Sequence, residues 1–277
     1  KANNPIEIYF KASKSAHKLI EEFMLLANRK VADFIGKQSL PFVYRVHDEP
    51  DPDKLQTFGN FLKKFGYDLQ TSNRKKIATS MNQVLADVHG KEEANMIETL
   101  AIRTMAKASY TTENIGHYGL AFTHYSHFTS PIRRYPDVIV HRLLQHYLNK
   151  GKAADKKTIE QLCKHASQQE IKATKAERDS IKYMQAKYMS EKVDMNFEGI
   201  ISGVTNFGIF VEITNTGCEG LIKMRDIPGD FYFFDEDNYC LEGTNTGKIY
   251  QLGDTVKVKI RKVDISKKEI DLILLLH

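Results

Sequence analysis

The chain contains 277 residues, of which 42% are hydrophobic and 27% are charged. Its length suits two domains rather than one small domain, and its composition excludes an intrinsically disordered chain. The sequence has no run of about 18 apolar residues, so we expect no membrane-spanning helix and no membrane partner. The three cysteines, Cys163, Cys218 and Cys240, form no CxxC pair, which predicts ordinary thiols in a reducing cytoplasm.

The net charge of +5 is unevenly distributed along the chain. Residues 193–277 contain 9 Lys and Arg and 14 Asp and Glu, a balance of −5. Residues 1–192 contain the other 31 basic and 21 acidic residues, a balance of +10. This positive balance predicts a polyanionic partner for the first part. Nucleic-acid binding by the second part must depend on more than net charge.

The first hundred residues are predicted to be mainly helical. The alternating segment 6–10 predicts a strand, and Ser13 is a suitable N-cap for a helix over 14–37. Apolar residues in that helix recur at spacings of three and four, which predicts one buried face: Ile20, Phe23, Met24, Ala27, Val31 and Phe34. A short strand and three helices are expected next: 41–47, 51–66, 73–88 and 92–108.

The second half of the chain changes character near Lys192. The segment 109–129 is rich in Gly, Tyr and His and is expected to be irregular, and a helix is expected over 130–149. The apolar stripe of a long helix over 155–190 is Ile159, Leu162, Ala166, Ala173, Ile181, Met184 and Tyr188. From 193 onward, short segments with period-two alternation and glycine turns predict a small β-barrel.

The segment HFTSPIRRYPD, residues 127–137, contains an unusual pair of arginines. With Ser130 as N-cap and Pro131 at the first helical position, Arg133 and Arg134 would lie in the first helical turn. The positive end of the helix dipole disfavours cations there, unless a phosphate is bound at the same place. The alternative is that the arginines pair with Asp137, and the residues alone favour neither interpretation.

Three stretches resemble the ribonuclease II/R exoribonuclease family. GHYGLAFTHYSHFTSPIRRYPDVIVHRLL resembles the end of its catalytic (RNB) domain, and HKLIEEFMLLANRKVADFIGK resembles the helix that lines its RNA channel. KATKAERDSIKYMQAKYM resembles the final helix of that domain. The resemblance implies that Arg133 contacts the phosphate nearest the scissile bond. It also places Arg134, Tyr135 and His127 among the RNA-binding residues.

Three glutamates are further site residues that the resemblance implies. Glu21 or Glu22 would lie near the ribose of the 3′-terminal nucleotides, and the sequence does not choose between them. Glu177 would have a catalytic role at the exit side of the catalytic cavity. Its neighbours on one helix face predict partial burial: Ala173, Ile181 and Met184. The alternatives are a solvated helix edge for Glu21 and Glu22 and an ion pair with a nearby lysine for Glu177.

No metal site is expected in this chain. His117, His124 and His127 are clustered, but no second pair of ligands has a zinc spacing, so loop packing and hydrogen bonding are favoured. The acidic run at 48–53 contains prolines and precedes a helix, which is typical of a turn with an N-cap. The acidic run at 235–238 is expected to be a loop.

Residues 193–277 resemble an S1 domain, which is a barrel of the OB fold. Phe207 and Phe210 match the S1 aromatics that stack on bases, and stacking works despite local acidity. The alternative for one of the two phenylalanines is a place in the barrel core. The insertion at 229–243, GDFYFFDEDNYCLEG, resembles the extended loop of S1 domains in the ribonuclease R branch of the family.

Three lysines of the S1-like part are predicted to bind RNA. Lys257 and Lys259 alternate along one strand and would face the RNA backbone. Lys223 occupies the position where many S1 domains carry a histidine. It keeps a positive charge for RNA, but it removes the stacking role of that histidine.

The resemblance implies a processive 3′→5′ exoribonuclease that hydrolyses single-stranded RNA to nucleoside 5′-monophosphates. In this family clustered aspartates hold Mg²⁺, which activates water and stabilises the leaving oxygen. Those aspartates lie upstream of the matching segments, so we expect no Mg²⁺ ligands here and no nuclease activity from this chain alone. Because the sequence starts at Lys1 without methionine, we expect a truncated part of an active enzyme.

The expected fold class is α+β. Residues 1–192 are expected to form the mainly helical C-terminal portion of an RNB catalytic domain, and residues 193–277 an S1-type OB-fold β-barrel. The expected partner is single-stranded RNA. Truncation would expose apolar helix faces, so self-association is a further expectation. The alternative function is a stand-alone, non-catalytic RNA-binding module.

Overall fold

The computed structural model describes residues 4–10, 12–91, 93–236 and 238–275. Contacts divide the chain into two compact units. The arginine unit comprises Lys11–Asp51 and Met105–Lys175, and the barrel unit comprises Lys1–Phe10, Pro52–Thr104 and Ala176–His277. Within the described ranges, no helix is both long enough and apolar enough to cross a membrane.

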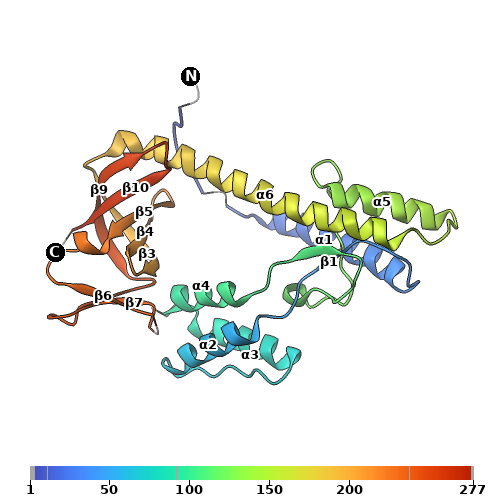
Figure 1. Ribbon diagram of the computed structural model, residues 1–277, viewed down its shortest axis with the longest axis horizontal. Helices are drawn as coiled ribbons and strands as arrows, with labels where there is room; N and C mark the ends of the chain where they lie inside the picture. Colours follow the sequence, from blue (N-terminus) through green and yellow to red (C-terminus); the bar gives the residue numbers. More distant parts are fainter. Residues whose placement is uncertain (1–3, 11, 92, 237, 276–277) are drawn as a thin grey trace. The chain divides into compact units, whose positions relative to one another are not determined.

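The arginine unit combines helices with a two-stranded ribbon (Figure 1). Its elements are α1 (Ser15–Gly36), β1 (Tyr44–Val46), β2 (Ser109–Thr111), the short helix η1 (Tyr118–Leu120), α5 (Tyr135–Leu148) and the first part of α6 (Lys156–Met189). β1 and β2 pair antiparallel, with Arg45 opposite Tyr110. Apart from β2 and η1, the segment 109–129 is irregular, as the sequence predicts.

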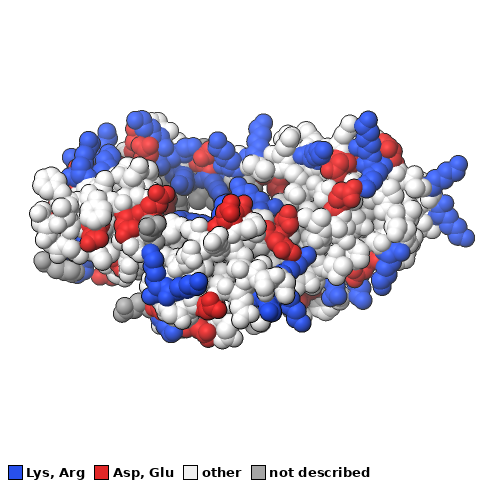
Figure 2. Space-filling model, turned by 60° about the horizontal axis from the view of Figure 1, so that its bottom comes forward, with Lys and Arg blue, Asp and Glu red and all other residues white. Residues whose placement is uncertain are grey.

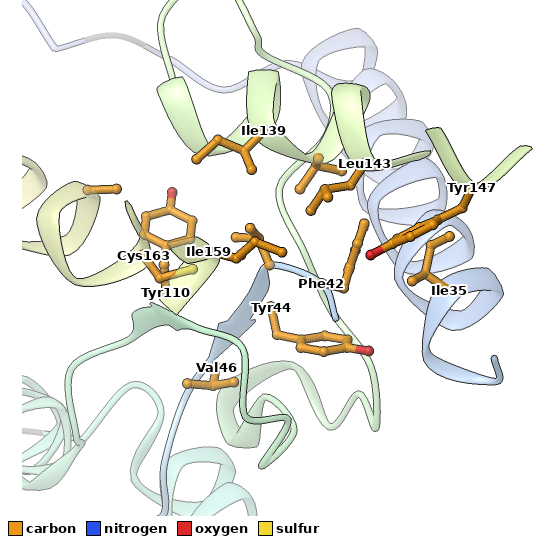
Figure 3. Packing of buried hydrophobic residues seen from close by; sticks show 13 residues of the cluster. Ile35, Phe42, Tyr44, Val46, Tyr110, Ile139, Leu143, Tyr147, Ile159 and Cys163 are labelled. Carbon is orange, nitrogen blue, oxygen red and sulfur yellow. The ribbon is translucent and has the colours of Figure 1, made fainter. Parts of the chain in front are cut away.

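The core of the arginine unit lies between the ribbon and its helices (Figure 3). α5 presents one apolar face because Ile139, Leu143 and Tyr147 recur every four residues. Phe42 is fully buried and packs edge-to-face on Tyr44, with ring centroids 5.6 Å apart. Burial of each large apolar side chain contributes about 1.5–3 kcal/mol. This cluster therefore fixes the ribbon against α5 and α6, where the functional residues lie.

α1 differs from its predicted start and its predicted packing. The helix begins at Ser15, so Lys14 rather than Ser13 occupies the N-cap position. Its buried residues form a stripe that the periodicity did not predict: Asn28, Ala32 and Ile35. Ile20 and Phe23, from the predicted buried face, are 60% and 61% exposed. Met24, Ala27 and Val31 of the predicted face are half-buried, and Val31 packs against the core, so the prediction holds for only part of that face.

The predicted strand over 6–10 is wrong. These residues form no strand, and Ile6, Tyr9 and Phe10 are 86%, 80% and 64% exposed. A strand needs a partner for its backbone N–H and C=O groups. Among the strands that the structure describes, none pairs with this segment.

The barrel unit contains three short helices and a closed β-barrel (Figure 1). The helices are α2 (Pro52–Lys63), α3 (Arg74–Val88) and α4 (Ala94–Thr104). The barrel strands are β3 (Asn196–Thr205), β4 (Gly208–Ile213), β5 (Cys218–Lys223), β9 (Thr255–Asp264) and β10 (Glu269–Leu274), in the order β10-β5-β4-β3-β9. The predicted α+β fold with an OB-type barrel is confirmed.

A second, three-stranded sheet follows β5 in the chain. It consists of β6 (Tyr232–Asp235), β7 (Cys240–Gly243) and β8 (Ile249–Gln251). The insertion predicted at 229–243 thus forms mostly a hairpin, because β6 and β7 pair antiparallel. The acidic run at 235–238 lies at the end of β6 and in the turn that follows, in its described residues.

Candidate nucleic-acid interface

The arginine motif forms a turn that precedes a helix. α5 begins at Tyr135, so the prediction of a helix starting at Pro131 is wrong, and neither arginine lies in a first helical turn. The Arg134 N–H donates to the Ser130 carbonyl at 3.0 Å, which closes the turn. Two prolines fit the first turn of a helix, and the structure uses Pro136 instead of Pro131.

The two arginines have different environments. Asp137 is fully buried, and its Oδ1 accepts the Ser130 N–H and the Arg134 guanidinium, both at 2.8 Å. The alternative interpretation, pairing with Asp137, therefore holds for Arg134. Arg133 is exposed, and its side chain forms no ion pair or hydrogen bond with any described residue. Its guanidinium is available to an anion from solution.

Arg133 faces a cavity of about 620 Å³ between the motif and α6. The motif contributes residues 133–136, β2 contributes Tyr110, and α6 contributes Leu162, His165, Ala166, Gln169, Glu170 and Ala173. The predicted residues Arg133, Arg134 and Tyr135 thus share one site. All of this lining belongs to the arginine unit.

A group of buried and half-buried side chains supports the wall of this cavity. The Tyr110 hydroxyl lies 2.7 Å from His127 Nδ1, and the Arg45 guanidinium lies 4.6 Å from the centre of the Tyr110 ring. Burial, followed by the charges of Arg134 and Arg45, lowers the pKa of His127 from 6.5 to about 3. Burial raises the pKa of Tyr110 to about 12. A protonated phenol and a neutral imidazole can then share one hydrogen bond.

The other histidines of the loop pack and form hydrogen bonds, as predicted. His117 packs edge-to-face on Tyr125, with centroids 5.3 Å apart. His124 Nδ1 lies 3.2 Å from Asp33 Oδ1. Within the described ranges, no group of three or more His, Cys, Asp or Glu side chains could hold a metal ion.

The three predicted glutamates lie outside this cavity. Glu21 and Glu22 are exposed on α1. Glu177 belongs to the barrel unit and is exposed, so its predicted partial burial is wrong. Every residue from 171 to 178 is exposed, whereas the packed turns of α6 lie nearer its ends. Periodicity detects an apolar stripe, but it does not reveal which part of the stripe is covered.

An aromatic pair lies on the outer surface of the barrel. Phe207, in the turn between β3 and β4, is 53% exposed, and Phe210 on β4 is half-buried. Their rings meet edge-to-face with centroids 5.9 Å apart. The ring of Phe210 lies over Gly203, where an added Cβ would approach it to 3.3 Å. Neither ring is in the barrel core, so that alternative is wrong for both.

The predicted lysines occupy two places on the barrel. Lys223 on β5 lies opposite Gly208, beside the turn that holds Phe207, and pairs with Asp271 at 3.1 Å. Lys257 and Lys259 alternate outward along β9, as predicted.

The partners of the two β9 lysines differ. Lys257 is opposite Glu198 on β3 and is exposed, whereas Lys259 forms an ion pair with Asp194 at 2.9 Å. Basic side chains are spread over the face in view in Figure 2, without one dominant patch. An aromatic surface with few uncompensated cations can bind RNA mainly by stacking.

Arg45, Tyr110 and Glu170 belong to the cavity wall or support it, but they were not predicted from the sequence. Arg45 forms two hydrogen bonds with Glu170, at 2.6 and 3.1 Å, although the two residues are 125 positions apart in the chain. A single sequence contains no signal for such a long-range pair. The fold brings them together by placing β1 next to β2 and α6 over both.

Two protein families match the chain. The RNB domain matches residues 1–150, and the S1 RNA binding domain matches residues 191–274. Ribonuclease R of Aquifex aeolicus is 40% identical over 270 residues, which cover 96% of this chain and 38% of that protein. Ribonuclease R of Escherichia coli is 36% identical over 268 residues, which cover 92% of this chain and 33% of that protein.

Solved structures agree with these relatives. Mycoplasma genitalium RNase R in complex with ribose methylated single-stranded RNA has a TM-score of 0.85 and 31% identity. The match covers 98% of this chain and 44% of that one. The apo form of the same protein also gives a TM-score of 0.85. The chain therefore spans less than half the length of the relatives that it matches.

Proposed function

The chain belongs to the RNB family of ribonucleases and carries an S1 RNA-binding domain, and from this premise we propose that it is part of a processive 3′→5′ exoribonuclease. The proposed substrate is single-stranded RNA, and the products are nucleoside 5′-monophosphates. Within that enzyme, this chain binds RNA at two surfaces, the cavity beside Arg133 and the aromatic pair of the barrel. The RNA-bound state of one similar structure supports the choice of ligand.

The observation that carries this proposal is the environment of Arg133. Its guanidinium is exposed at a cavity and has no acidic partner among the described residues, while its neighbour Arg134 is neutralised by Asp137. A free guanidinium binds two phosphate oxygens through parallel hydrogen bonds. Arg133 is thus the residue that we assign to the phosphate of the RNA.

Other side chains complete the proposed RNA path. Tyr135, which is 49% exposed at the same cavity, is placed to contact the nucleotide that Arg133 holds. Arg134 also lines the cavity, where Asp137 neutralises its charge, whereas His127 acts from behind the wall through its hydrogen bond with Tyr110. We also propose roles for three exposed glutamates. Glu21 or Glu22 would lie near the 3′-terminal nucleotides of the RNA, and Glu177 would have a catalytic role.

The barrel is proposed to hold the incoming strand. Phe207 and Phe210 stack on bases, and stacking on an aromatic ring is worth about 1–3 kcal/mol per base. Lys257 is the predicted lysine with the most exposed position, while Lys223 and Lys259 already have acidic partners. Stacking is therefore assigned the larger share of binding at this surface.

The RNB ribonucleases use divalent metal ions, and we propose Mg²⁺ for the whole enzyme. Bound Mg²⁺ would supply activated water and stabilise the leaving oxygen. The described residues do not fit such a site, because they contain no cluster of three or more His, Cys, Asp or Glu side chains that could hold a metal ion. No step is therefore assigned to Mg²⁺ in this chain, and we expect this chain alone to bind RNA without cleaving it.

A cytoplasmic location and self-association are further parts of the proposal. Cys163, Cys218 and Cys240 are buried free thiols, which suit a reducing compartment. α1 exposes a row of large apolar side chains that could pair with a second copy: Leu19, Ile20, Phe23 and Leu26. Sedimentation velocity over a range of protein concentrations tests self-association.

The test of the RNA site compares two arginine variants by fluorescence anisotropy with a labelled single-stranded oligoribonucleotide. Arg133→Ala removes the proposed phosphate contact, so we expect binding about tenfold weaker or more. Arg142→Ala is the matched control, because Arg142 is an exposed arginine of the same unit that does not line the cavity. Equal effects of the two variants would contradict the assignment of Arg133.

A further inference from the structure

Glu170 presents a carboxylate to the cavity that is proposed to hold a phosphate. Its side chain is 37% exposed and lines the same cavity as Arg133. A carboxylate near a phosphodiester is repulsive, and a low-dielectric wall strengthens this repulsion. A cavity that binds RNA must therefore contain something that cancels the charge of Glu170.

Arg45 is placed to cancel that charge. Its Nη1 and Nη2 donate to the two carboxylate oxygens of Glu170 at 2.6 and 3.1 Å, a two-pronged pair. The Arg45 side chain is 14% exposed and is not part of the cavity lining. Its positive charge therefore acts on the cavity through Glu170, rather than by direct contact with a ligand.

The surrounding elements hold both partners in place. Arg45 lies on β1, its N–H donates to the Tyr125 carbonyl at 2.9 Å, and its guanidinium lies over the ring of Tyr110. One helical turn before Glu170, the hydroxyl of Ser167 accepts the Tyr110 N–H at 2.9 Å. α6 is thus fixed to the ribbon at the level of the pair, and Glu170 remains at the cavity wall.

We propose that Arg45 is a positioning residue that neutralises Glu170, so that the cavity beside Arg133 accepts a phosphodiester of single-stranded RNA. This inference rests on the proposed function of that cavity. Arg45 itself does not touch RNA. Glu170 without Arg45 would repel the phosphate and weaken its binding, so the pair sets the charge of the site.

A merely structural ion pair would behave differently from this charge-setting pair. If the pair only held α6 on the ribbon, loss of either partner would damage the cavity in the same way. If Arg45 acts by neutralising Glu170, the two single variants should change RNA affinity in opposite directions. The double variant should then bind nearly as the wild type does, because the uncompensated charge is gone.

The experiment is a double-mutant cycle on the full chain. The variants Arg45→Gln, Glu170→Gln and the combination of both are titrated with a labelled single-stranded oligoribonucleotide, followed by anisotropy. We expect Arg45→Gln to bind about tenfold more weakly, Glu170→Gln to bind as well as the wild type or a few-fold more tightly, and the double variant to recover. Weaker binding by Glu170→Gln, or no recovery in the double variant, would overturn the inference.

Two further variants separate the charge effect from general effects. Lys156→Gln is the matched control, because Lys156 forms an exposed ion pair with Glu113 at 2.5 Å, away from the cavity lining. It removes the same charge, and we expect less than a twofold change. Arg45→Lys keeps the charge but loses the two-pronged hydrogen bonding and the contact with the Tyr110 ring, so we expect an RNA affinity between those of Arg45→Gln and the wild type. A loss as large as that of Arg45→Gln would overturn the inference.

The outcomes also distinguish this inference from the proposed function. If Arg133→Ala weakens RNA binding but the three variants of the cycle bind as the wild type does, only the role of Arg45 is overturned. Absence of RNA binding by the wild-type chain would overturn both. Thermal unfolding of each variant is measured in the same buffer, so that a change in affinity is read only from folded protein.

Discussion

Arg133 and Arg134 are neighbours in the sequence, yet the fold gives them separate tasks. The sequence indicates that both are unusual, because two cations stand near the predicted start of a helix. It could not separate them, since the difference depends on which arginine reaches buried Asp137. Arg134 does so at 2.8 Å, and Arg133 remains exposed at the cavity. One arginine stabilises the turn, and the other is available to RNA.

Asp137→Ala should be much more damaging to stability than Arg133→Ala. Asp137 has no exposed surface, and its loss would leave the Arg134 charge and the Ser130 N–H without their partner. Breaking such a buried pair costs about 3–5 kcal/mol of unfolding free energy. Arg133→Ala should change it by less than about 0.5 kcal/mol. Urea unfolding of both variants measures the difference, and similar values would contradict the division of roles.

His127 should make stability depend on pH below neutrality. Its pKa is lowered from 6.5 to about 3 in the folded chain, chiefly by burial and by Arg134. The unfolded chain therefore takes up a proton between about pH 6.5 and pH 3 that the folded chain refuses. The contribution of neutral His127 to the free energy of unfolding is fully present above pH 6.5. It declines as the pH falls through that window, by about 1 kcal/mol per pH unit.

The control for this pH dependence is His127→Gln. Glutamine keeps a hydrogen-bonding group near Tyr110 but does not titrate. Urea unfolding at several values between neutral pH and about pH 5 should give a shallower slope for the variant than for the wild type. Identical slopes would show that His127 titrates normally in the folded chain.

The sequence predicted the positions of most helices and strands, but not which of their faces are covered. Helices α2, α3 and α6 lie close to their predicted ranges, because apolar periodicity is a local signal. The structure adds a cap that was not predicted, since the Asn73 side chain accepts the Lys76 N–H at 2.9 Å. Burial of Phe23 and Glu177 was predicted wrongly, since burial depends on neighbours that no local pattern specifies.

The start of α5 shows the same limit. Both Pro131 and Pro136 are suitable for a first helical turn, so the local pattern allowed two starting points. In the observed turn, buried Asp137 accepts hydrogen bonds from both Ser130 and Arg134. These contacts are local in the chain, but the burial of Asp137 that makes them important is not visible in the sequence.

Gly208→Ala should disrupt the barrel where β3 turns into β4. Gly208 has a φ of +150°, and a Cβ there would collide with the Ile222 carbonyl oxygen and lie 2.9 Å from the Lys223 Cα. Because the obstacle is backbone, we expect a loss of about 3–5 kcal/mol in stability. Faster hydrogen exchange in β3 and β4 would show it.

Gly229→Ala provides the matched control for the barrel. Gly229 also has a positive φ, of +95°, but an added Cβ would meet no atom within 4 Å. Only the backbone strain of about 1–2 kcal/mol should remain. If both glycine variants raise hydrogen exchange in β3 and β4 equally, the close approach of β5 to Gly208 is not what requires glycine.

Composition and motifs predicted the kinds of domain in the chain, but not the geometry of the site. The change of charge and of periodicity predicts a boundary near residue 192, which stays a prediction, and the S1 match covers residues 191–274, where the barrel strands lie. The charge-setting pair of Arg45 and Glu170 could not be predicted, because its partners lie 125 residues apart. Local sequence patterns predict helices and strands. The wall of the cavity forms only when distant parts of the chain pack together.

RNA binding by this chain should depend on salt, and RNA cleavage should be absent. Residues 1–192 carry a balance of +10, so RNA affinity should fall steeply as salt is raised, by about 0.7 log units per log unit of salt for each phosphate contact on a single strand. Stacking on Phe207 and Phe210 is less sensitive to salt, so weak binding should persist at high salt. With Mg²⁺ present, the RNA should keep its length, because no described cluster can hold the metal.

One set of samples tests both parts of this prediction. A labelled single-stranded RNA is titrated over a salt series, and the same mixtures are then run on a denaturing gel. Salt-dependent binding without shortening is the expected result. Shortening of the RNA from the 3′ end, abolished by Arg133→Ala, would be the contrary result. It would mean that the chain holds a working metal site and is a nuclease by itself, rather than only the RNA-binding part of one.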